Sequence, residues 1–444
     1  MNIVMLGGNS SFGKENTTYS NEVWEGSPSQ TAMQNAYQAG AERILITDNA
    51  LRALVKWGQA IVGDDNDSSD GKFNRFSSEA ALDNWVRNRL TKYCYENGFY
   101  GIVLNDEPVY GYTQNLGTVY QSIKRVAKSL GIEVYIHLNL LPADVDKSML
   151  GADTSLERGE LYRSYIENII LATNAERLSL DIYPFMDWGF KTGYFSMLQI
   201  FTDVCKDYNV NTSLCVQTFA SQSHAYRTEL SEEEIYFQIY NAMGLGFDHI
   251  YFYTYLTDGG EVNNGSSFIN TDGKKTEVYN AAQKVIAEAQ AFADFILKYD
   301  YQGCALYAKS IKYQFDASHF IANYFSYAPQ DEKSMVFVND SFAKLNSVSV
   351  DDDLLFVTEL KNESGQYMYM VQNVLDPYYI GYTDGFLFWQ TTVDGNLTAT
   401  LNFGADCKGV YEYSQGEWIY VAIENGEYTC TLDAAMAVFV IPVY

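Results

Sequence analysis

Short apolar runs alternate with amphipathic stretches through about the first 300 residues of the chain. The apolar runs have the length of strands, and the stretches between them repeat with the period of a helix. The predicted strands span residues 2–8, 43–48, 100–105, 132–139, 177–183, 212–218 and 249–255. The predicted helices include residues 80–97, 116–130, 158–173, 194–208, 232–244 and 276–297, and Ser231 with Glu234 predicts a capping box at one of them. This alternation predicts parallel strands joined by right-handed crossovers.

The number of these units favours a closed (β/α)₈ TIM barrel over an open doubly wound sheet. Gly7 and Gly8 follow the first strand without the Gly-x-Gly-x-x-Gly spacing of a dinucleotide-binding fold. Only seven strands are clear, so the eighth is expected either in the weak segment 60–63 or ahead of residue 1, in a barrel truncated at its N-terminus. A truncated start would fit an extracellular or cell-surface protein whose signal peptide lay upstream. Otherwise a cytoplasmic location is expected.

The pattern changes after residue 300. Period-two runs appear at residues 354–360, 366–373, 399–403, 418–423 and 436–443, and the turn signals 362–365 and 424–427 separate some of them. Such runs are typical of an antiparallel β-sandwich. The sequence therefore predicts a catalytic barrel over residues 1–300 and a sandwich domain over residues 301–444.

Composition narrows the classes of partner. The 444 residues carry 29 Lys and Arg against 56 Asp and Glu, a formal charge of -27, which would repel nucleic acid but not a neutral sugar. No apolar run approaches the roughly 18–20 residues that a membrane helix needs, so no membrane span is expected. Six cysteines without a Cys-x-x-Cys pair, and only four histidines, argue against a zinc site and against a disulfide framework. No metal and no cofactor are expected, and the sequence says nothing of the oligomeric state.

In a barrel of this kind the active site lies at the C-terminal ends of the strands. The polar and aromatic residues predicted there are Asp48, Asn105, Asp106, Glu107, His137, Asn139, Asp181, Tyr183, Gln217, Tyr253 and Tyr255, with Trp188 on the loop after Asp181. Amides, aromatic rings and carboxylates suit a sugar. These strand ends lack both a basic cluster for phosphate and the lysine that a Schiff-base aldolase requires.

The segment Asn105-Asp106-Glu107-Pro108 is the sharpest motif, because an apolar strand ends there in two adjacent acids before a proline. Glycosidic cleavage needs a carboxylic acid to protonate the leaving oxygen and a second group across the sugar ring. A carboxyl held among aromatic rings can have its pKa raised enough for that role. The other interpretation is a helix cap or a surface turn. Asp48 could likewise only cap the helix near Asn49, and His137 could be a satisfied barrel histidine.

The same segment resembles the Asn-Glu-Pro acid/base motif that closes the fourth strand of clan A retaining glycosidases. The strands 178–184 and 250–255 resemble those of the family 42 β-galactosidase-like enzymes, and residues 353–373 with 401–443 resemble the small sandwich that often follows such barrels. The resemblance implies a glycoside hydrolase in which Glu107 is the general acid/base. The resemblance extends over nearly the whole chain, and it rests on short motifs.

One departure from that pattern leaves the mechanism open. Clan A enzymes carry a nucleophilic Glu at the end of the seventh strand, where the matching segment 214–219 offers Gln217, and an amide cannot attack the anomeric carbon. The second carboxylate could be Asp181 or, next, Asp48.

Two further explanations compete. The Asp-Glu pair also resembles that of the family 20 and family 123 N-acetylhexosaminidases, the latter with Asp-Glu-Pro. Asp106 would then orient a 2-acetamido group whose carbonyl Tyr183 or Tyr255 could hold. Alternatively the nucleophile is lost and the protein is a non-catalytic carbohydrate-binding barrel. The prediction is hydrolysis of an O-glycosidic bond, with Asp181 stabilising the charge of the oxocarbenium-like state.

Overall fold

The structure is a computed structural model. It describes residues 2–7, 22–25, 29–63, 75–186, 189–190, 193–220, 230–255, 257, 267–307, 338–351, 355–374, 380–383, 386–389 and 395–444. For residues 2–7, 22–25, 186, 189–190, 380–383 and 386–389 only the backbone is described.

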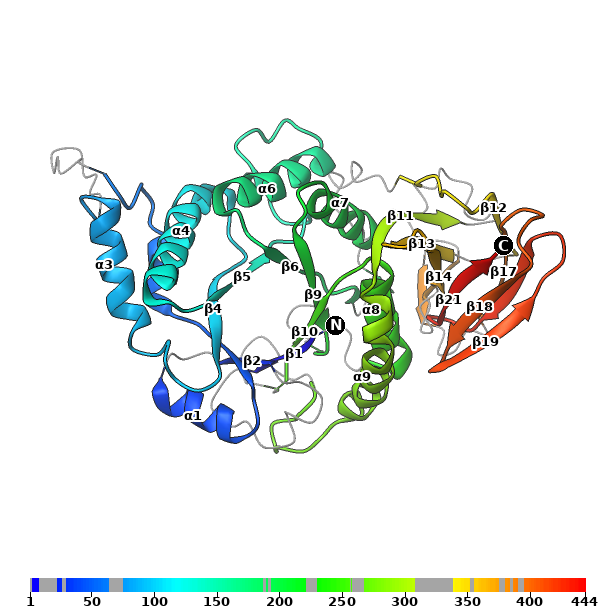
Figure 1. The fold of residues 1–444 in the computed structure, drawn as a ribbon, viewed down its shortest axis with the longest axis horizontal. Coiled ribbons are helices and arrows are strands. Elements are labelled where there is room, and N and C mark those ends of the chain that lie inside the picture. Colours follow the sequence, from blue (N-terminus) through cyan, green and yellow to red (C-terminus); the bar gives the residue numbers. More distant parts are fainter. Residues whose placement is uncertain are drawn as a thin grey trace.

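Eight parallel strands close into a barrel, which confirms the predicted fold class (Figure 1). Around the ring, each strand pairs with the next and the last pairs with the first. The strands are β1 (Asn2–Gly7), β2 (Glu22–Glu25), β3 (Arg43–Ile46), β4 (Phe99–Asp106), β5 (Tyr135–Leu140), β6 (Arg177–Asp181), β9 (Asn211–Gln217) and β10 (His249–Tyr253).

The eighth strand is β2. It lies neither in segment 60–63 nor ahead of residue 1, the two places where it was expected. Segment 60–63 contributes only one isolated bridge, between Val62 and Phe76, outside the barrel. β2 pairs with β1 on one side and with β3 on the other through all four of its residues. A strand of four residues with Glu at both ends is too short to show a period in the sequence. With β2 counted, β4 is the fourth barrel strand and β9 is the seventh.

The helices form an outer layer around the strands (Figure 1). They are α1 (Gln30–Gln38), α2 (Asn49–Val55), α3 (Glu79–Leu90), α4 (Thr113–Leu130), α6 (Arg158–Thr173), α7 (Tyr194–Asp207), α8 (Glu232–Gly244) and α9 (Glu277–Ile296), with the short α5 (Lys147–Leu150) and the 3-10 turn η2 (Tyr110–Tyr112). The predicted capping box is present at α8: the Ser231 side chain accepts from the Glu234 N–H and the Glu234 side chain accepts from the Ser231 N–H. None of the described helices is long and apolar enough to cross a membrane.

Alternation along each strand sorts side chains into two cores. Leu45, Val103, Cys215 and Tyr251 point inward and pack together inside the barrel. Their neighbours along the strands, such as Ile44 and Ile46, belong to the larger core between strands and helices. The barrel interior is therefore a packed core below a polar rim, as closed barrels of this size require.

The C-terminal part is a β-sandwich, also as predicted. Its larger sheet has the order β11 (Tyr299–Tyr307), β13 (Leu355–Asn362), β14 (Tyr367–Asn373), β21 (Ala437–Val443), β18 (Gly409–Ser414), β19 (Glu417–Ala422). The smaller sheet consists of β12 (Ser347–Val350), β17 (Leu397–Asn402) and β20 (Glu427–Leu432). Two short hairpins complete the described strands: β7 (Phe185–Met186) with β8 (Gly189–Phe190), and β15 (Ile380–Thr383) with β16 (Phe386–Trp389).

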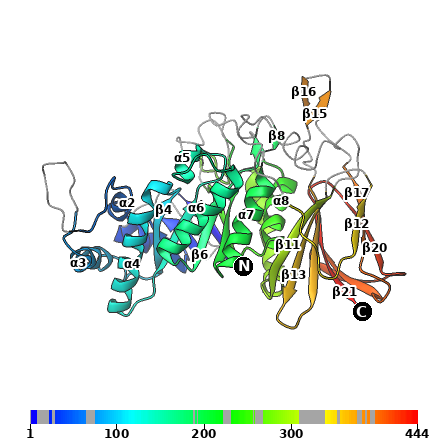
Figure 2. The same cartoon turned by 90° about the horizontal axis from the view of Figure 1, so that it is seen from above.

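The central strands of the larger sheet are buried on both faces, between the barrel helices and the smaller sheet (Figure 2). In β14, Met368 and Met370 join the core of the barrel helices, whereas Tyr369 and Val371 join the core of the sandwich. Polar contacts also cross this interface. The Asn241 amide of α8 donates to Gln372 Oε1 at 2.6 Å.

Asp203 of α7 is half-buried where the barrel meets the sandwich. Burial, and then the charge of Asp340, raise the pKa of Asp203 from 3.8 to about 6. The folded protein therefore holds this proton more tightly than the unfolded chain does. The ionised form costs stability above pH 6, and that cost disappears as the pH falls from 6 toward 4.

Asp203→Asn is expected to increase the free energy of unfolding at pH 8 by about 1 kcal/mol, allowing for solvent screening of a half-buried group. At about pH 4 it should have little effect, because the wild-type carboxyl is then protonated. Urea denaturation at both pH values measures the difference. Asp294→Asn on the exposed side of α9 is the control. An equal stabilisation at both pH values would contradict the titration assigned to Asp203.

Candidate active site

The end of β4 contains a bulge that decides which acid faces the barrel interior. Val103 lies level with His137 of β5, but the next partners are Asn105 with Leu138 and Asp106 with Asn139. One extra residue in β4 thus reverses the alternation after Leu104. Leu138 packs in the helix-side core, so Asn105 faces that side, and Asp106 takes the inward direction beside Asn139.

Asp106 is the inward carboxylate of the fourth strand. It is half-buried, and the Asn139 amide donates to its Oδ1 at 3.1 Å. Asn139 is itself 4% exposed, and its Oδ1 has no hydrogen-bond partner among the described residues. A buried acceptor without a donor is costly, so a ligand hydroxyl or amide at this position would satisfy it.

Glu107 stands at the rim, one residue after Asp106. Its backbone is left-handed, with φ 54°, and its N–H donates to the Asn139 carbonyl at 2.8 Å. The carbonyl of Pro108 then accepts the Tyr165 hydroxyl of α6 at 2.7 Å, which ties the turn to the helix layer. A non-glycine residue in this region of backbone space is uncommon and often marks a functional position.

The structure corrects one expectation about Glu107. Glu107 is exposed, whereas the motif suggested a carboxyl held among aromatic rings, and a left-handed turn places it just past the end of the strand. The enclosed carboxylates are Asp106 and Asp181.

Asp181, at the end of β6, is 8% exposed and accepts the Tyr183 hydroxyl at 3.5 Å. Burial first, then the charge of Asp181 and more weakly that of Asp106, raise the pKa of the Cys215 thiol. Both carboxylates therefore lie near the same inward cysteine of β9. β5 separates β4 from β6, so the two strand ends are roughly 10 Å apart, and inward side chains shorten that distance.

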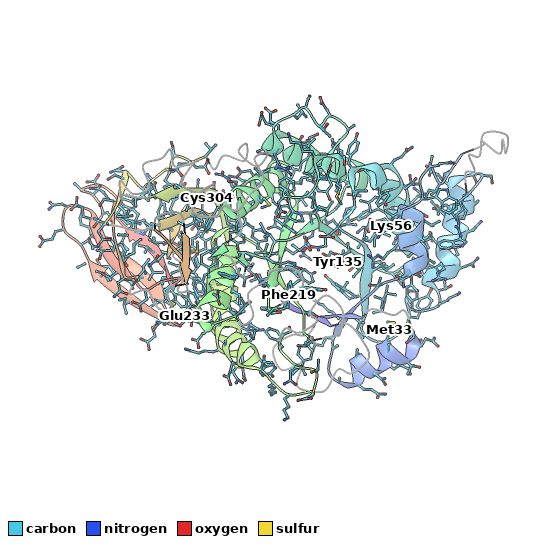
Figure 3. All side chains as sticks on the ribbon, turned by 180° about the vertical axis from the view of Figure 1, so that it is seen from behind. Met33, Lys56, Tyr135, Phe219, Glu233 and Cys304 are labelled. Carbon is cyan, nitrogen blue, oxygen red and sulfur yellow. The ribbon has the colours of Figure 1, made fainter. Side chains whose placement is uncertain are left out.

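An aromatic group faces these acids. The Tyr183 and Tyr253 rings stack at 5.9 Å with 24° between their planes. Phe219 meets both rings edge-on, at 5.1 Å from Tyr183 and 5.3 Å from Tyr253. Tyr183 and Tyr253 are half-buried and Phe219 is buried. Phe219 lies inside the ring of strands in Figure 3. The sequence analysis missed it, and its one signal was its place two residues after Gln217.

Gln217 has a structural role. It is fully buried at the end of the seventh strand, where its Oε1 accepts the Phe185 N–H at 2.9 Å. Its Nε2 donates to the carbonyls of Phe185, at 2.9 Å, and Phe219, at 3.3 Å. The amide thus fastens the loop after β6 to β9. With these bonds in place its side chain has no group left for substrate, unlike the predicted role.

Asp48 also has a structural role. It caps the N-terminus of α2, as the alternative interpretation expected. Its Oδ1 accepts the N–H groups of Ala50, at 2.9 Å, and Leu51, at 3.4 Å, at the start of α2. It forms an ion pair with Arg89 at 2.6 Å and accepts the Tyr93 hydroxyl at 3.1 Å. Arg89 belongs to α3, so the carboxylate faces the helix layer and not the mouth. It can be neither a substrate ligand nor the second catalytic carboxylate.

The other predicted positions divide as follows. His137 is buried below the rim, against the Tyr251 ring at 4.7 Å, and burial lowers its pKa to about 3, so it is a neutral core residue. Tyr255 packs with Phe268 in the helix-side core, away from the mouth. Asn105 is fully buried and accepts the Asp106 N–H at 3.0 Å, so it supports the bulge. Trp188 lies outside the described residues.

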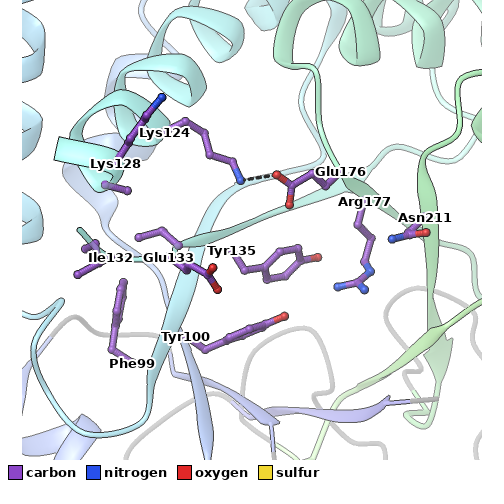
Figure 4. A pocket seen from close by; sticks show the side chains of 12 residues that line it. Phe99, Tyr100, Lys124, Lys128, Ile132, Glu133, Tyr135, Glu176, Arg177 and Asn211 are labelled. Carbon is purple, nitrogen blue, oxygen red and sulfur yellow. Dashed lines mark hydrogen bonds and ion pairs between the residues drawn. The ribbon is translucent and has the colours of Figure 1, made fainter. Parts of the chain in front are cut away.

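A hollow of about 840 Å³ opens at the opposite end of the barrel, where β4, β5 and β6 begin (Figure 4). Tyr100 and Tyr135 lie side by side in it, with ring centroids 5.3 Å apart, and the Arg177 guanidinium lies over Tyr135 at 5.3 Å. Arg177 also pairs with Asp248 at 2.9 Å. These contacts close the base of the barrel and include none of the strand-end acids.

The described residues contain no group of three His, Cys, Asp or Glu side chains that could hold a metal ion. All six cysteines are buried and unpaired. Among the described residues, the groups at the rim are carboxyl groups, one amide and two phenols. Such groups can donate protons, accept protons and orient a polar ligand.

The chain matches no protein-family model and no curated protein. Among solved structures it is similar to a GH30 endoxylanase from Clostridium papyrosolvens C71, with 12% identity, 100% of this chain and 96% of that chain covered, and a TM-score of 0.42. It is also similar to an α-amylase from Anoxybacillus, with 9% identity, 96% and 87% coverage, and a TM-score of 0.48. A β-galactosidase from Marinomonas ef1 has 10% identity, 68% and 62% coverage, and a TM-score of 0.40.

These three are glycoside hydrolases by name, and at such identities the likeness concerns fold alone. The comparisons do not confirm a specific resemblance to family 42 or to family 123.

Asp48→Ala is expected to lower the free energy of unfolding by about 3 to 5 kcal/mol, because it leaves Arg89 and the first turn of α2 without their buried partner. Urea denaturation measures the loss. Asp207→Ala is the control, since its pair with Arg163 at 3.4 Å is exposed and should contribute less than about 0.5 kcal/mol. A loss below about 1 kcal/mol for Asp48→Ala would contradict its structural role.

Proposed function

We propose that the protein is a glycoside hydrolase that cleaves an O-glycosidic bond at the C-terminal mouth of the barrel. The observation that best supports the proposal is that Asp106 and Asp181 lie near the same Cys215 and that Glu107 follows Asp106 at the exposed end of β4. The motif lies on the fourth barrel strand, the position that the resemblance to clan A glycosidases implies. A paired-carboxylate site is what glycosidic hydrolysis requires.

Glu107 is the proposed general acid. Its carboxyl would give a proton to the bridging oxygen as the bond from that oxygen to the anomeric carbon breaks, and the leaving sugar would depart as an alcohol. The residue is accessible at the rim, where a substrate can reach it. Its position on a turn fixed by Asn139 and Tyr165 keeps the backbone of the acid in one place.

Asp106 is the proposed positioning group. Asn139 orients the carboxylate by donating to its Oδ1, and the carboxylate is proposed to accept a hydroxyl or an amide N–H from the sugar. Asp181 is proposed to stabilise the positive charge that develops at the anomeric carbon. Tyr183 and Tyr253 would receive the C–H face of a sugar ring next to these acids.

Because Gln217 is fully bonded at the end of the seventh strand, the attacking group is proposed to come from elsewhere. Two sources are compatible with the rim. Asp181 could act as the facing carboxylate, or the substrate's own 2-acetamido oxygen could attack while Asp106 orients it. The two schemes differ in the substrate they require and in the variant that abolishes them.

Glu107→Gln is expected to reduce kcat by about 100- to 10,000-fold on a natural oligosaccharide, whose leaving group needs a proton. A dinitrophenyl glycoside, whose leaving group departs unprotonated, should be affected much less. Steady-state kinetics on the two substrates measures the ratio, and Glu160→Gln, an exposed glutamate of α6, is the control. Equal losses on both substrates would contradict the general-acid role. A wild type that binds sugars without turnover would indicate the alternative, a non-catalytic carbohydrate-binding barrel.

Asp106→Asn and Asp181→Asn are expected to separate the two schemes. If the acetamido group attacks, only 2-acetamido glycosides are cleaved, and Asp106→Asn lowers their kcat about 100-fold or more. If Asp181 is the facing carboxylate, glycosides without that group are cleaved, and Asp181→Asn gives the larger loss. Kinetics on a matched pair of aryl glycosides, with and without the 2-acetamido group, distinguishes them. Full activity of both variants on both substrates would exclude both schemes.

A further inference from the structure

The strands β18 and β19 form one edge of the larger sandwich sheet and expose an aromatic surface. Tyr411 and Tyr413 of β18 lie level with Tyr420 and Trp418 of β19, so all four side chains share one face. That face is the one turned to the barrel, since Tyr413 is buried against Phe292 of α9, with ring centroids 4.0 Å apart. The other three are exposed, and Trp418 also contacts α9 through Phe295. We call Tyr411, Trp418 and Tyr420 the sheet-edge aromatic surface.

These three side chains are unusually exposed for neighbouring aromatic residues. Tyr411 is 47% exposed, Trp418 is 39% exposed and Tyr420 is 52% exposed. Scattered apolar side chains on a surface need no explanation, whereas a contiguous group on one face often marks a binding site. The Tyr411 and Tyr420 rings lie 5.3 Å apart, so the two form one continuous surface.

Contacts within the protein hold the rings in place. Tyr420 lies over Gly409, where an added Cβ would collide with its ring, so the glycine allows the ring to lie against the backbone. Trp418 packs on Phe295 at 5.0 Å and on Tyr413 at 5.2 Å. Side chains fixed in this way lose little conformational freedom when a ligand binds.

We propose that the sheet-edge aromatic surface binds a neutral polysaccharide chain, separately from the barrel mouth. Aromatic rings that expose a face to water suit the C–H faces of sugar rings. The choice of a sugar as ligand rests on the proposed function, which supplies a reason for the chain to meet a polysaccharide.

Negative charge disfavours two other occupants. The chain carries a net charge of -27, and Glu417 is exposed on the same hairpin. A polyanion is repelled by such a surface, and so is a second copy of this chain approaching edge to edge. An uncharged ligand meets no such opposition.

The test is a depletion assay with the full chain and four insoluble polysaccharides: cellulose, xylan, mannan and chitin. The wild type is expected to be retained by at least one of them. The double variant Tyr411→Ala/Tyr420→Ala should lose retention at least tenfold, whereas Tyr411→Phe/Tyr420→Phe, which keeps both rings, should retain it. Tyr95→Ala removes a tyrosine that is 64% exposed on the barrel and is the matched control.

Hydrolysis of a small soluble aryl glycoside is measured in parallel, and the double alanine variant should keep the wild-type rate. Retention without hydrolysis in the wild type would sink the proposed function and leave this inference standing. Three results overturn the inference: no retention by any of the four polysaccharides, retention unchanged in the double alanine variant, or a wild-type dimer that the double alanine variant dissociates.

Discussion

Closure of the barrel by hydrogen bonds between neighbouring parallel strands is the constraint on which the rest of the structure depends. Eight strands must pair in a ring, so every inward side chain shares one narrow interior. The lower part of that interior is filled by Leu45, Val103, Cys215 and Tyr251. Polar groups can accumulate only where the strands end. Asp106 and Asp181 lie at the same end of the barrel because the ring places β4 and β6 on either side of β5.

The β4 bulge shows how much one residue changes within that ring. Without it, Asn105 would point into the barrel and Asp106 would face the helices. With it, Asp106 points inward, Asn139 holds it, and Asn105 is left to support the turn. Glu107 then follows in a left-handed conformation at the rim. The acid pair of the motif is thus divided between an enclosed position and an accessible one, and this division suits two carboxyl groups with different roles.

The sequence was sufficient for the architecture and for the strand ends, because a long period-two or helical pattern reports which face of an element is buried. It could not show the direction of a side chain at those ends. Asn105 and Asp106 exchanged faces through a bulge that has no signature in the pattern, and Asp48 and Gln217 turned to backbone partners in other elements. β2 was missed because four residues are too few to show a period. Phe219 was missed because it lies two residues beyond the end of β9 and carries no polar group.

The double-sided burial of the larger sandwich sheet has a consequence for how the chain can be divided. Met368 and Met370 face the barrel helices while Tyr369 and Val371 face the smaller sheet, so the same strand completes two cores at once. A cut between Ile296 and Tyr299 would strip an apolar layer from both fragments and leave each with a surface made for the other. The barrel and the sandwich are therefore coupled through a shared apolar interface, and we expect neither to keep its core intact without the other even though their topologies are distinct.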